Sequence, residues 1–496
     1  MCPWVLRSVV CCARRQSLTS GFRPDRVSLT VQNLLPPLDL RRTRRIVQLG
    51  VPLLGGQLSH YLKEVADAAM VGRLGPVELG AIGIAIMFTG VMFVIIWPVS
   101  VGTQALTSRR YGAQEGGQLA ADAEPRGPDT GAAVDNALFV GAVAGLLSLG
   151  ISFAAQPLFD AILENTEVAR TAAVYIDVMR FGIPFLAVEM SFMGFLAGIN
   201  KTGPIMVSNV AGNLVNVVVS YVLIFGKLGF PAMGVRGAAI GTVVAQALAA
   251  GYLFAVVLQP HLKHRYGYLR FDRIRRDTMG AIARAALPIS VQNGIALSVF
   301  LVYEAMVGSL GAVHLAVIHL VFSLFRINKT IVGGFARAAA ILVGNALGRG
   351  DTDDAEAYLR ASVGLGMAVG VGIMVLVFAL PRETASIFTN DAPTLAVAAR
   401  ALRFFAVFFF IEVIGYSFEI VFTGNGWGRF VLASEFSTNV LFILGLSALL
   451  LFVLEAGSYG AWSGFAVYQV AHAAFLTAGY VSGRWKHVEI EKGEAT

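Results

Sequence analysis

The chain has 496 residues, of which 56% are hydrophobic and only 14% are charged. Soluble domains carry about 25% charged residues, so this composition excludes an ordinary soluble globular protein and indicates one that lies mostly in a membrane. The formal net charge of +7 has two readings, basic membrane-flanking loops or binding to nucleic acid.

The first 45 residues form a separate compositional block, rich in Arg and nearly free of acidic residues. They lack the long apolar core of a signal peptide. We expect residues 1–45 to be a disordered basic tail or extension; a transit peptide and a misplaced start are the alternatives. Cys2, Cys11 and Cys12 all lie in this block, so no disulfide or metal framework can be built from cysteines in the rest of the chain.

Twelve apolar runs follow, each long enough to cross a bilayer, which takes about 20 helical residues. The sequence therefore predicts an all-α polytopic membrane protein with twelve transmembrane helices, and the lipid bilayer is its first expected partner. The predicted spans lie near residues 46–72, 78–104, 134–156, 172–199, 204–226, 234–258, 282–308, 313–343, 358–380, 398–423, 430–454 and 459–483.

The basic residues of the loops predict the orientation, because Lys and Arg accumulate on the cytoplasmic side. They concentrate ahead of the first span and in the central segment "HLKHRYGYLRFDRIRRD" at 261–277. We therefore expect both termini in the cytoplasm, a multi-pass protein of the inner (plasma) membrane, and a basic cytoplasmic linker at 259–281. The same asymmetry explains the net charge, so no nucleic-acid partner is expected. Residues 484–496 are predicted to be a polar C-terminal tail.

The linker separates two copies of an internal sequence repeat. Pro52 pairs with Pro288 and Gly112 pairs with Gly348, both at a spacing of 236 residues. The same spacing pairs "AMVG" at 69–72 with "AMVG" at 305–308, and Leu74-Gly75 with Leu310-Gly311. The repeat predicts two six-helix lobes, at 46–258 and 282–483. An even number of helices in each lobe gives both lobes the same orientation, an architecture typical of alternating-access carriers.

These repeated phrases resemble the multidrug and toxic compound extrusion (MATE) family of the flippase-like transporter superfamily. The resemblance covers about residues 46–483 and rests on "GVPLLGGQLSHYLKEVADAAMVGRLG" with "LTSRRYGAQ", and on "ALPISVQNGIALSVFLVYEAMVGSLG" with "LVGNALGRGD". A third phrase is "GFLAGINKTGPIMVSNVAGNLVNVVVSYVLIFG" with its partner "FTGNGWGRF". The resemblance implies a V-shaped pair of lobes and export of organic, often cationic, compounds in exchange for H⁺ or Na⁺.

Charged residues in the first span predict an ion-coupling site. Each charge within the bilayer costs at least a few kcal/mol, so it is expected to have a function or a partner. Asp67 matches the acidic residue of the family's first helix, which implies a carboxylate that binds the coupling ion. His60, Glu64 and Asp67 share one helical face, and Lys63 lies one turn before Asp67, so a static ion pair is the alternative. Asn213, Asn216 and Ser220 share a face of the fifth span and are expected around Asp67. Ser220 stands where some members have a second Asp.

The second half carries a second set of charges. Arg326 and Lys329 lie deep in the eighth predicted span, and Glu304, Glu412 and Glu419 are their expected counter-ions. This set is predicted to be a second coupling site, a cationic surface for an anionic substrate, or a structural ion-pair network.

No catalytic pattern is found. The sequence has no P-loop, no Gly-x-Ser-x-Gly turn and no zinc-ligand spacing, so we expect no enzyme, no ATP, no metal and no cofactor beyond the coupling ion. The predicted function is secondary-active antiport of a small organic substrate by a monomer. The alternatives are a lipid-linked-precursor flippase of the same superfamily, an exporter of an anionic metabolite, and a non-transporting scaffold.

Overall fold

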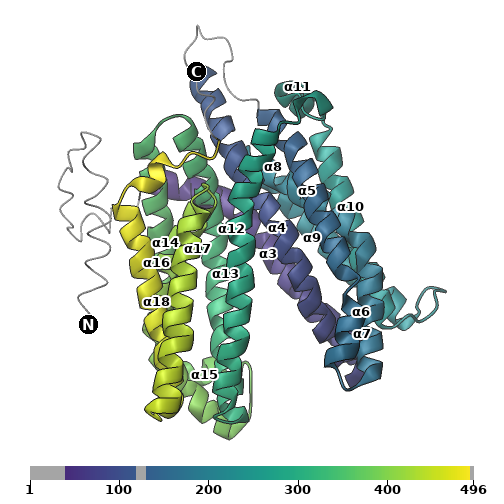
Figure 1. Cartoon of the computed structure of the whole chain (residues 1–496), viewed down its shortest axis with the longest axis vertical. Helices are drawn as coiled ribbons and strands as arrows, with labels where there is room; N and C mark the ends of the chain where they lie inside the picture. Colours follow the sequence, from purple (N-terminus) through teal and green to yellow (C-terminus); the bar gives the residue numbers. More distant parts are fainter. Residues whose placement is uncertain (1–38, 119–129, 492–496) are drawn as a thin grey trace. The chain divides into compact units, whose positions relative to one another are not determined.

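The computed structural model describes residues 39–118 and 130–491. Residues 1–38, with the three cysteines and most of the predicted tail, and the polar loop 119–129 lie outside the described residues, as do residues 492–496. The described chain forms a bundle of long helices (Figure 1). Ten segments of it are long and apolar enough to cross a membrane. The fold is therefore that of an all-helical polytopic membrane protein, as the apolar runs predicted.

All twelve predicted spans coincide with helices. The N-terminal bundle contains α3 (Leu40–Gly72), α4 (Pro76–Gln118), α5 (Thr130–Ser152), α6 (Ala155–Ile162), α7 (Thr166–Met179), α8 (Ile183–Gly198), α9 (Thr202–Phe225) and α10 (Val235–Val257). The C-terminal bundle contains α12 (Arg276–Gly308), α13 (Ala312–Gly348), α14 (Thr352–Ala379), α15 (Pro381–Ser386), α16 (Ala392–Thr423), α17 (Gly428–Thr438) and α18 (Gly457–Val481). α3 and α18 are not among these ten apolar segments. α3 carries several charged residues, and α18 is rich in Gly, Ser and Tyr, so both are less hydrophobic.

Two helices begin outside the predicted lobe boundaries. α3 begins at Leu40, inside the range predicted as a tail, because the Asp39 side chain caps it by accepting from the backbone N–H groups of Arg41 and Arg42. The hydrogen bond from the Arg42 backbone lowers the pKa of Asp39. α12 begins at Arg276, inside the predicted linker, and the short helix α11 (Pro260–Tyr266) occupies the linker's start.

The predicted repeat is visible in the backbone. Pro52 lies inside α3 and Pro288 inside α12, so the first long helix of each bundle carries a proline at the same position of the repeat. Gly75 and Gly311, also 236 residues apart, take φ values of +155° and +109° where the chain turns into α4 and α13. Side chains with a Cβ rarely adopt this conformation, which explains why both copies have glycine.

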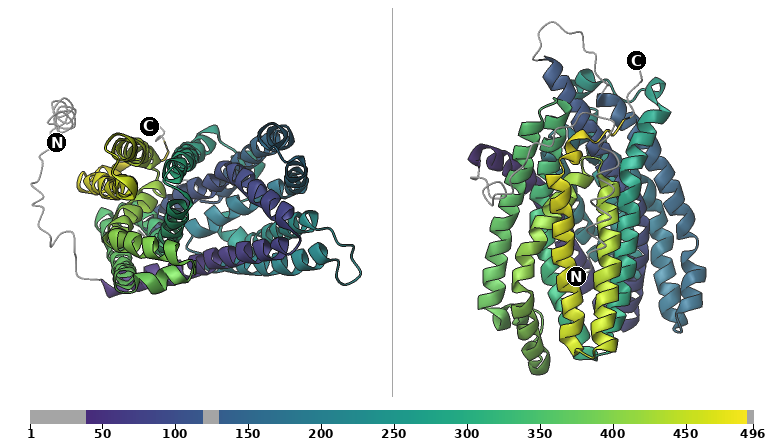
Figure 2. Two further views of the ribbon diagram at one scale, coloured as in Figure 1. Left: turned by 90° about the horizontal axis from the view of Figure 1, so that it is seen from below. Right: turned by 60° about the vertical axis from the view of Figure 1, so that its left-hand side comes forward.

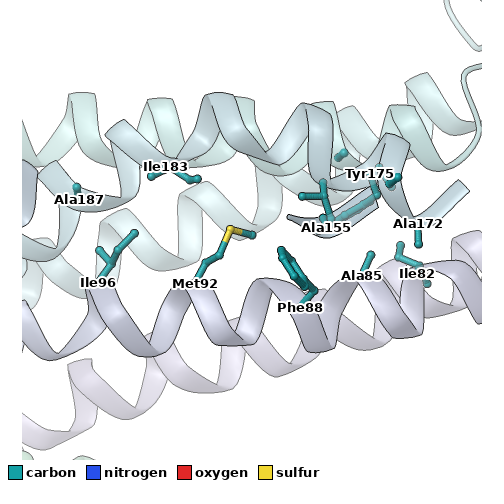
Figure 3. Packing of buried hydrophobic residues seen from close by; sticks show 14 of the residues in the cluster. Ile82, Ala85, Phe88, Met92, Ile96, Ala155, Ala172, Tyr175, Ile183 and Ala187 are labelled. Atoms are coloured by element: carbon teal, nitrogen blue, oxygen red, sulfur yellow. The ribbon is translucent and has the colours of Figure 1, made fainter. Parts of the chain in front are cut away.

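A continuous apolar core holds the N-terminal bundle together. Phe88 and Met92 of α4 pack among Ala155, Tyr175 and Ile183 from the following helices (Figure 3). The ring of Phe88 meets that of Phe159 edge-on, with centroids 5.4 Å apart. This core fixes α7 next to α4, and α7 carries Tyr175 of the site described below.

The two bundles meet through α3, α4, α12 and α13, and Figure 1 shows them closest toward the end that carries α11. The view from below in Figure 2 shows the yellow and green helices on one side and most of the blue ones on the other, with the purple helix α3 running beneath both. We call this end the closed end; it is formed where α4 crosses α12 and α13. A Cβ atom added at Gly112 would lie 2.0 Å from the carbonyl oxygen of Asn345, and one at Gly348 would lie 2.1 Å from that of Arg109. The glycines that the repeat paired thus let the two backbones touch.

The segment after α18 also joins the bundles, in contrast to the predicted tail. We call residues 484–491 the strap. Trp485 is buried in the C-terminal bundle, and Lys486 pairs with Glu356 of α14. Ile490 packs on the core of the N-terminal bundle, and Glu491 pairs with Arg110 of α4. Because the strap begins on the C-terminal bundle and ends on the N-terminal one, it spans the closed end.

Replacement of Glu356 tests the anchoring of the strap. Its carboxylate accepts from Lys486, Arg360 and the Tyr480 hydroxyl, the last at 2.8 Å. We expect Glu356→Gln to lower the free energy of unfolding by about 1.5–3 kcal/mol, since hydrogen bonds to a charged group contribute that much. The thermal midpoint in detergent measures it, and Glu383→Gln, at the start of α15, is the control. An unchanged midpoint would contradict the anchoring.

Candidate functional site

Asp67 lies on the buried face of α3. Its Oδ2 atom is 3.1 Å from the Lys63 Nζ atom, and the two side chains are 8% and 13% exposed. The Oδ1 atom is buried and has no hydrogen-bond partner among the described residues. The i, i+4 spacing on a helix brings Lys63 to Asp67, but it satisfies only one of the two carboxylate oxygens.

Polar side chains from three further helices lie in the same region. Tyr175 of α7 interacts electrostatically with both Lys63 and Asp67, and its hydroxyl also interacts with Thr242 of α10. Thr242 Oγ1 in turn accepts from Asn216 Nδ2 of α9 at 3.0 Å. The Oδ1 atom of Asn216 and the hydroxyl of Ser220 are buried without a partner among the described residues. Unsatisfied oxygens of this kind are the ligands that a proton or a hard cation takes.

The predicted neighbours do not bond to Asp67 directly. Asn213 donates to the hydroxyl of Ser59 at 2.8 Å, and Asn216 is held by Thr242 as described. Ser220 faces Gly241 of α10, where an added Cβ would lie 2.2 Å from the serine oxygen. Each of these residues thus takes part in packing α9 against α3 or α10, and their predicted role in ion coupling around Asp67 stays a prediction.

Glu64 points away from this group. It is 44% exposed, and its Oε1 atom is 3.4 Å from Nε2 of His60, one turn earlier. The charge of Arg326, on α13 of the other bundle, also acts on it. Glu64 thus belongs to the surface between the bundles, and Asp67 belongs to the interior of the N-terminal one.

In the C-terminal bundle the structure places Lys329 beside Glu412. Their Nζ and Oε1 atoms are 3.7 Å apart, and Glu412 is nearly fully buried. Glu412 also accepts from the amides of Asn328 at 2.9 Å and Gln469 at 3.4 Å. The Lys329 ammonium lies 5.1 Å from the ring centroid of Tyr416, within range of a cation–π contact.

The other predicted counter-ions have different partners. Arg326 is exposed and makes no ion pair among the described residues. Glu304 pairs instead with His319, at 3.2 Å. Glu419 lies close to His472, at 3.5 Å, and accepts from Gln292. Of the three expected counter-ions, Glu412 pairs with Lys329, whereas the expectation that Glu304 and Glu419 pair with Arg326 or Lys329 is corrected.

Glu435 and His472 are the site residues that the sequence analysis missed. His472 Nε2 lies 3.6 Å from Glu435 Oε1, and both side chains are buried. Single charged or polar residues on α17 and α18 carry no spacing pattern. A buried Glu in the eleventh span was the only signal available.

The Lys329–Glu412 pair gives a stability prediction. The Lys329 side chain is 38% exposed and that of Glu412 only 3%, so removing Lys329 leaves a buried carboxylate uncompensated, at a cost of up to about 3–5 kcal/mol. We expect Lys329→Met to lower the thermal midpoint strongly, and the double variant Lys329→Met/Glu412→Gln to recover most of the loss. Thermal unfolding of all three proteins measures this, and no recovery in the double variant would show that the two charges are independent.

Comparison with known protein families gives one match in each half of the chain. The family model described as MatE matches residues 52–222 and 288–447. The two matches begin at the residues of the Pro52–Pro288 pair, so each copy of the predicted repeat matches the family separately.

Individual relatives and solved structures agree with the family match. A probable multidrug resistance protein NorM of Rhizobium meliloti is 28% identical over 446 residues, covering 87% of this chain and 91% of its own. The multidrug resistance protein PmpM of Pseudomonas aeruginosa is 26% identical over 389 residues, covering 76% and 79%.

Among solved structures, a MATE protein in the bent conformation superposes with a TM-score of 0.80 at 21% identity, covering 92% of this chain and 97% of the other. An outward-facing multidrug resistance MATE family transporter gives 0.78 at 21%, with the same coverage. These structures share the fold. The twofold match of the family model, along two thirds of the sequence, identifies the chain as a member of the MATE family of membrane transporters.

Proposed function

We propose that this transporter exports small organic compounds, often cationic, in exchange for H⁺ or Na⁺, and that Asp67 is the residue that binds the coupling ion. The observation that supports this most directly is the buried Asp67 carboxylate with one unpaired oxygen. A carboxylate there can take up a cation and release it, which a fully satisfied structural residue cannot do without losing its partners. Relatives named as multidrug resistance proteins support the class of substrate.

The arrangement of the bundles supports alternating access. They touch at the closed end, which also carries α11 of the basic linker, and contacts between them thin out toward α6 and α15 (Figure 1). If the linker is cytoplasmic, as its charge indicates, this state is closed inside and open outside. We place the protein in the inner membrane, with both termini cytoplasmic, and take the monomer as the working unit.

Export of an anionic metabolite is the second candidate, and one observation favours it. Arg326 is exposed between the bundles, with no ion pair among the described residues. A free guanidinium attracts carboxylate or phosphate groups. Cationic and anionic substrates should therefore be compared in the same assay.

Transport into energised inside-out vesicles tests the proposal. A fluorescent organic cation and a fluorescent organic anion are offered in turn, with an imposed pH gradient and an imposed Na⁺ gradient tested separately. Uptake of the cation driven by one gradient supports the proposal and identifies the ion. Uptake of the anion alone favours the second candidate, and absence of gradient-driven uptake for either would refute antiport of such compounds.

A further inference from the structure

Three side chains from three helices of the C-terminal bundle each point one possible ligand atom toward a common centre. They are Glu419 of α16, Glu435 of α17 and His472 of α18, and their nearest ligand atoms all lie within 4.8 Å. The site stands apart from the Lys329–Glu412 pair, because Glu412 takes its hydrogen bonds from Asn328 and Gln469.

Each of the three is held in place through its other polar atom. Gln292 donates to Glu419 Oε1 at 2.7 Å. Asn439 donates to Glu435 Oε2 at 2.7 Å, and the Tyr468 hydroxyl also contacts this carboxylate at 3.2 Å. The Ser434 hydroxyl lies 3.2 Å from Nδ1 of His472. Such supporting bonds to the far atom of each ligand are typical of metal sites, where they fix the histidine tautomer and the ligand orientation.

The atoms that face the centre are Glu419 Oε2, His472 Nε2 and Glu435 Oε1, and the last of these also accepts from the Tyr468 hydroxyl at 3.4 Å. Glu419 Oε2 and Glu435 Oε1 lie 3.5 Å and 3.6 Å from His472 Nε2. That nitrogen is buried, and it has no hydrogen-bond partner in the described part of the chain. A charge-assisted N–H···O bond would be about 2.7–2.9 Å, so these distances are too long for a proton shared between His472 and either carboxylate.

The same distances suit ligands of one metal ion. Two ligands bonded at about 2.1 Å in a tetrahedral arrangement lie about 3.4 Å apart. One imidazole nitrogen and two carboxylate oxygens form a donor set that suits borderline divalent ions such as Zn²⁺, Co²⁺ and Mn²⁺.

The charge balance also requires a cation. Within residues 39–118 and 130–491, neither Glu419 nor Glu435 is ion-paired with a lysine or arginine. Lys329, whose charge reaches both at longer range, is already paired with Glu412. Two carboxylates buried with one histidine carry net negative charge, which is costly within a bilayer unless a cation compensates it.

We propose that Glu419, Glu435 and His472 form a binding site for one divalent transition-metal ion of the Zn²⁺ class, which ties α16, α17 and α18 together. The backbone leaves the α-helical pattern at Asn439, directly beside this site, where a π-helix runs to Leu446. π-Helical turns inside helices frequently occur at functional sites, so the irregular backbone fits the placement of a ligand there.

The test uses the untagged full-length protein in detergent, stripped with chelator and titrated with Co²⁺ while visible absorption is recorded. We expect one Co²⁺ per chain, displaced by Zn²⁺. His472→Ala is expected to weaken binding at least about 100-fold, and Ser434→Ala, which removes only the support of the imidazole, about 10- to 100-fold. His319→Ala, which removes a histidine that also faces a glutamate in this bundle, is the matched control and should leave the affinity unchanged.

Thermal unfolding provides a second readout that does not depend on how well the variants absorb. A metal that binds the folded state raises the midpoint, so Zn²⁺ should stabilise the wild type and the His319 variant but not the His472 variant. Equal Co²⁺ affinity in wild type and His472→Ala would overturn the proposal, as would displacement of Co²⁺ by Na⁺ at physiological concentration, which indicates an alkali-ion site. No gradient or substrate is present, so failure here would leave the role of Asp67 untouched.

Discussion

Asp67→Asn is expected to abolish gradient-driven efflux while leaving substrate binding intact. The amide is nearly the same size as the carboxylate, so the packing of α3 is kept. It cannot carry the negative charge that attracts a cation, nor alternate between a charged and a neutral form. We expect the response to an imposed pH or Na⁺ gradient to fall at least about 100-fold, which corresponds to about 2.7 kcal/mol of lost coupling. Uptake and dye binding are measured on the same vesicles.

The control for Asp67→Asn is Glu78→Gln, which neutralises a carboxylate in the first turn of α4, just after the turn that joins α3 to α4. It should transport as the wild type does. Because Asp67 is paired with Lys63 at 3.1 Å, Asp67→Asn also leaves a lysine without its partner, and Lys63→Met in the Asp67→Asn background separates this effect. If the double variant regains coupled transport, the only role of Asp67 is to neutralise the charge of Lys63, and it does not bind the coupling ion. Normal transport by Asp67→Asn alone would move the coupling site to another residue, with the charged C-terminal bundle the first place to look.

The sequence predicted the architecture because the signals for it are strong and local. Each apolar run extends over at least five helical turns, and a bilayer admits few alternatives to a helix. The paired prolines and glycines predicted the repeat for a physical reason that the structure supplies: Gly75 and Gly311 turn with positive φ, and Gly112 and Gly348 allow backbone contact. At such positions a side chain is strained or clashes with a neighbouring backbone, which is a reason for glycine in both copies.

Apart from Lys329 and Glu412, which the cost of a charge within the bilayer predicted to pair, the contacts of individual side chains were predicted only where one helix contains both partners. Lys63 and Asp67 are one turn apart, and helix geometry alone brings them together. Asn213, by contrast, could have reached Asp67 or Ser59, and only the rotation of α9 against α3 decides for Ser59. The site at Glu419 lay beyond sequence reasoning for the same reason, since its three members come from three helices and have no spacing in common.

The strap was missed because its anchors are polar. Residues 484–491, the described part of this segment, contain four charged side chains and a histidine, a composition that predicts a solvated tail. Lys486 and Glu491 instead find partners on opposite bundles, and Trp485 provides the buried anchor between them and α18. Partners of this kind are set by tertiary structure and leave no local pattern.

Gly112→Ala is expected to open the closed end. The added Cβ would lie 2.0 Å from the Asn345 carbonyl oxygen, and backbone atoms cannot move aside as a flexible side chain can, so α4 and α13 must separate. Overpacking of this kind costs on the order of 3 kcal/mol, which is a shift of about 100-fold against the state in which the two helices touch. Since alternating access needs both states, efflux should fall strongly even though Asp67 and its surroundings are unchanged.

Gly90→Ala is the matched control, because it makes the same substitution in the same helix at a position with no atom within 4 Å of the added Cβ. The opening can be read from a cysteine at Ser108, which is fully buried against Gly344 at the closed end, after Cys2, Cys11 and Cys12 are replaced by serine. A water-soluble maleimide should label this cysteine in Gly112→Ala and leave it unlabelled in Gly90→Ala and in the parent. If both glycine variants remain unlabelled and transport equally well, the crossing of α4 and α13 can widen without separating the bundles, and the contact at Gly112 is not what closes this end.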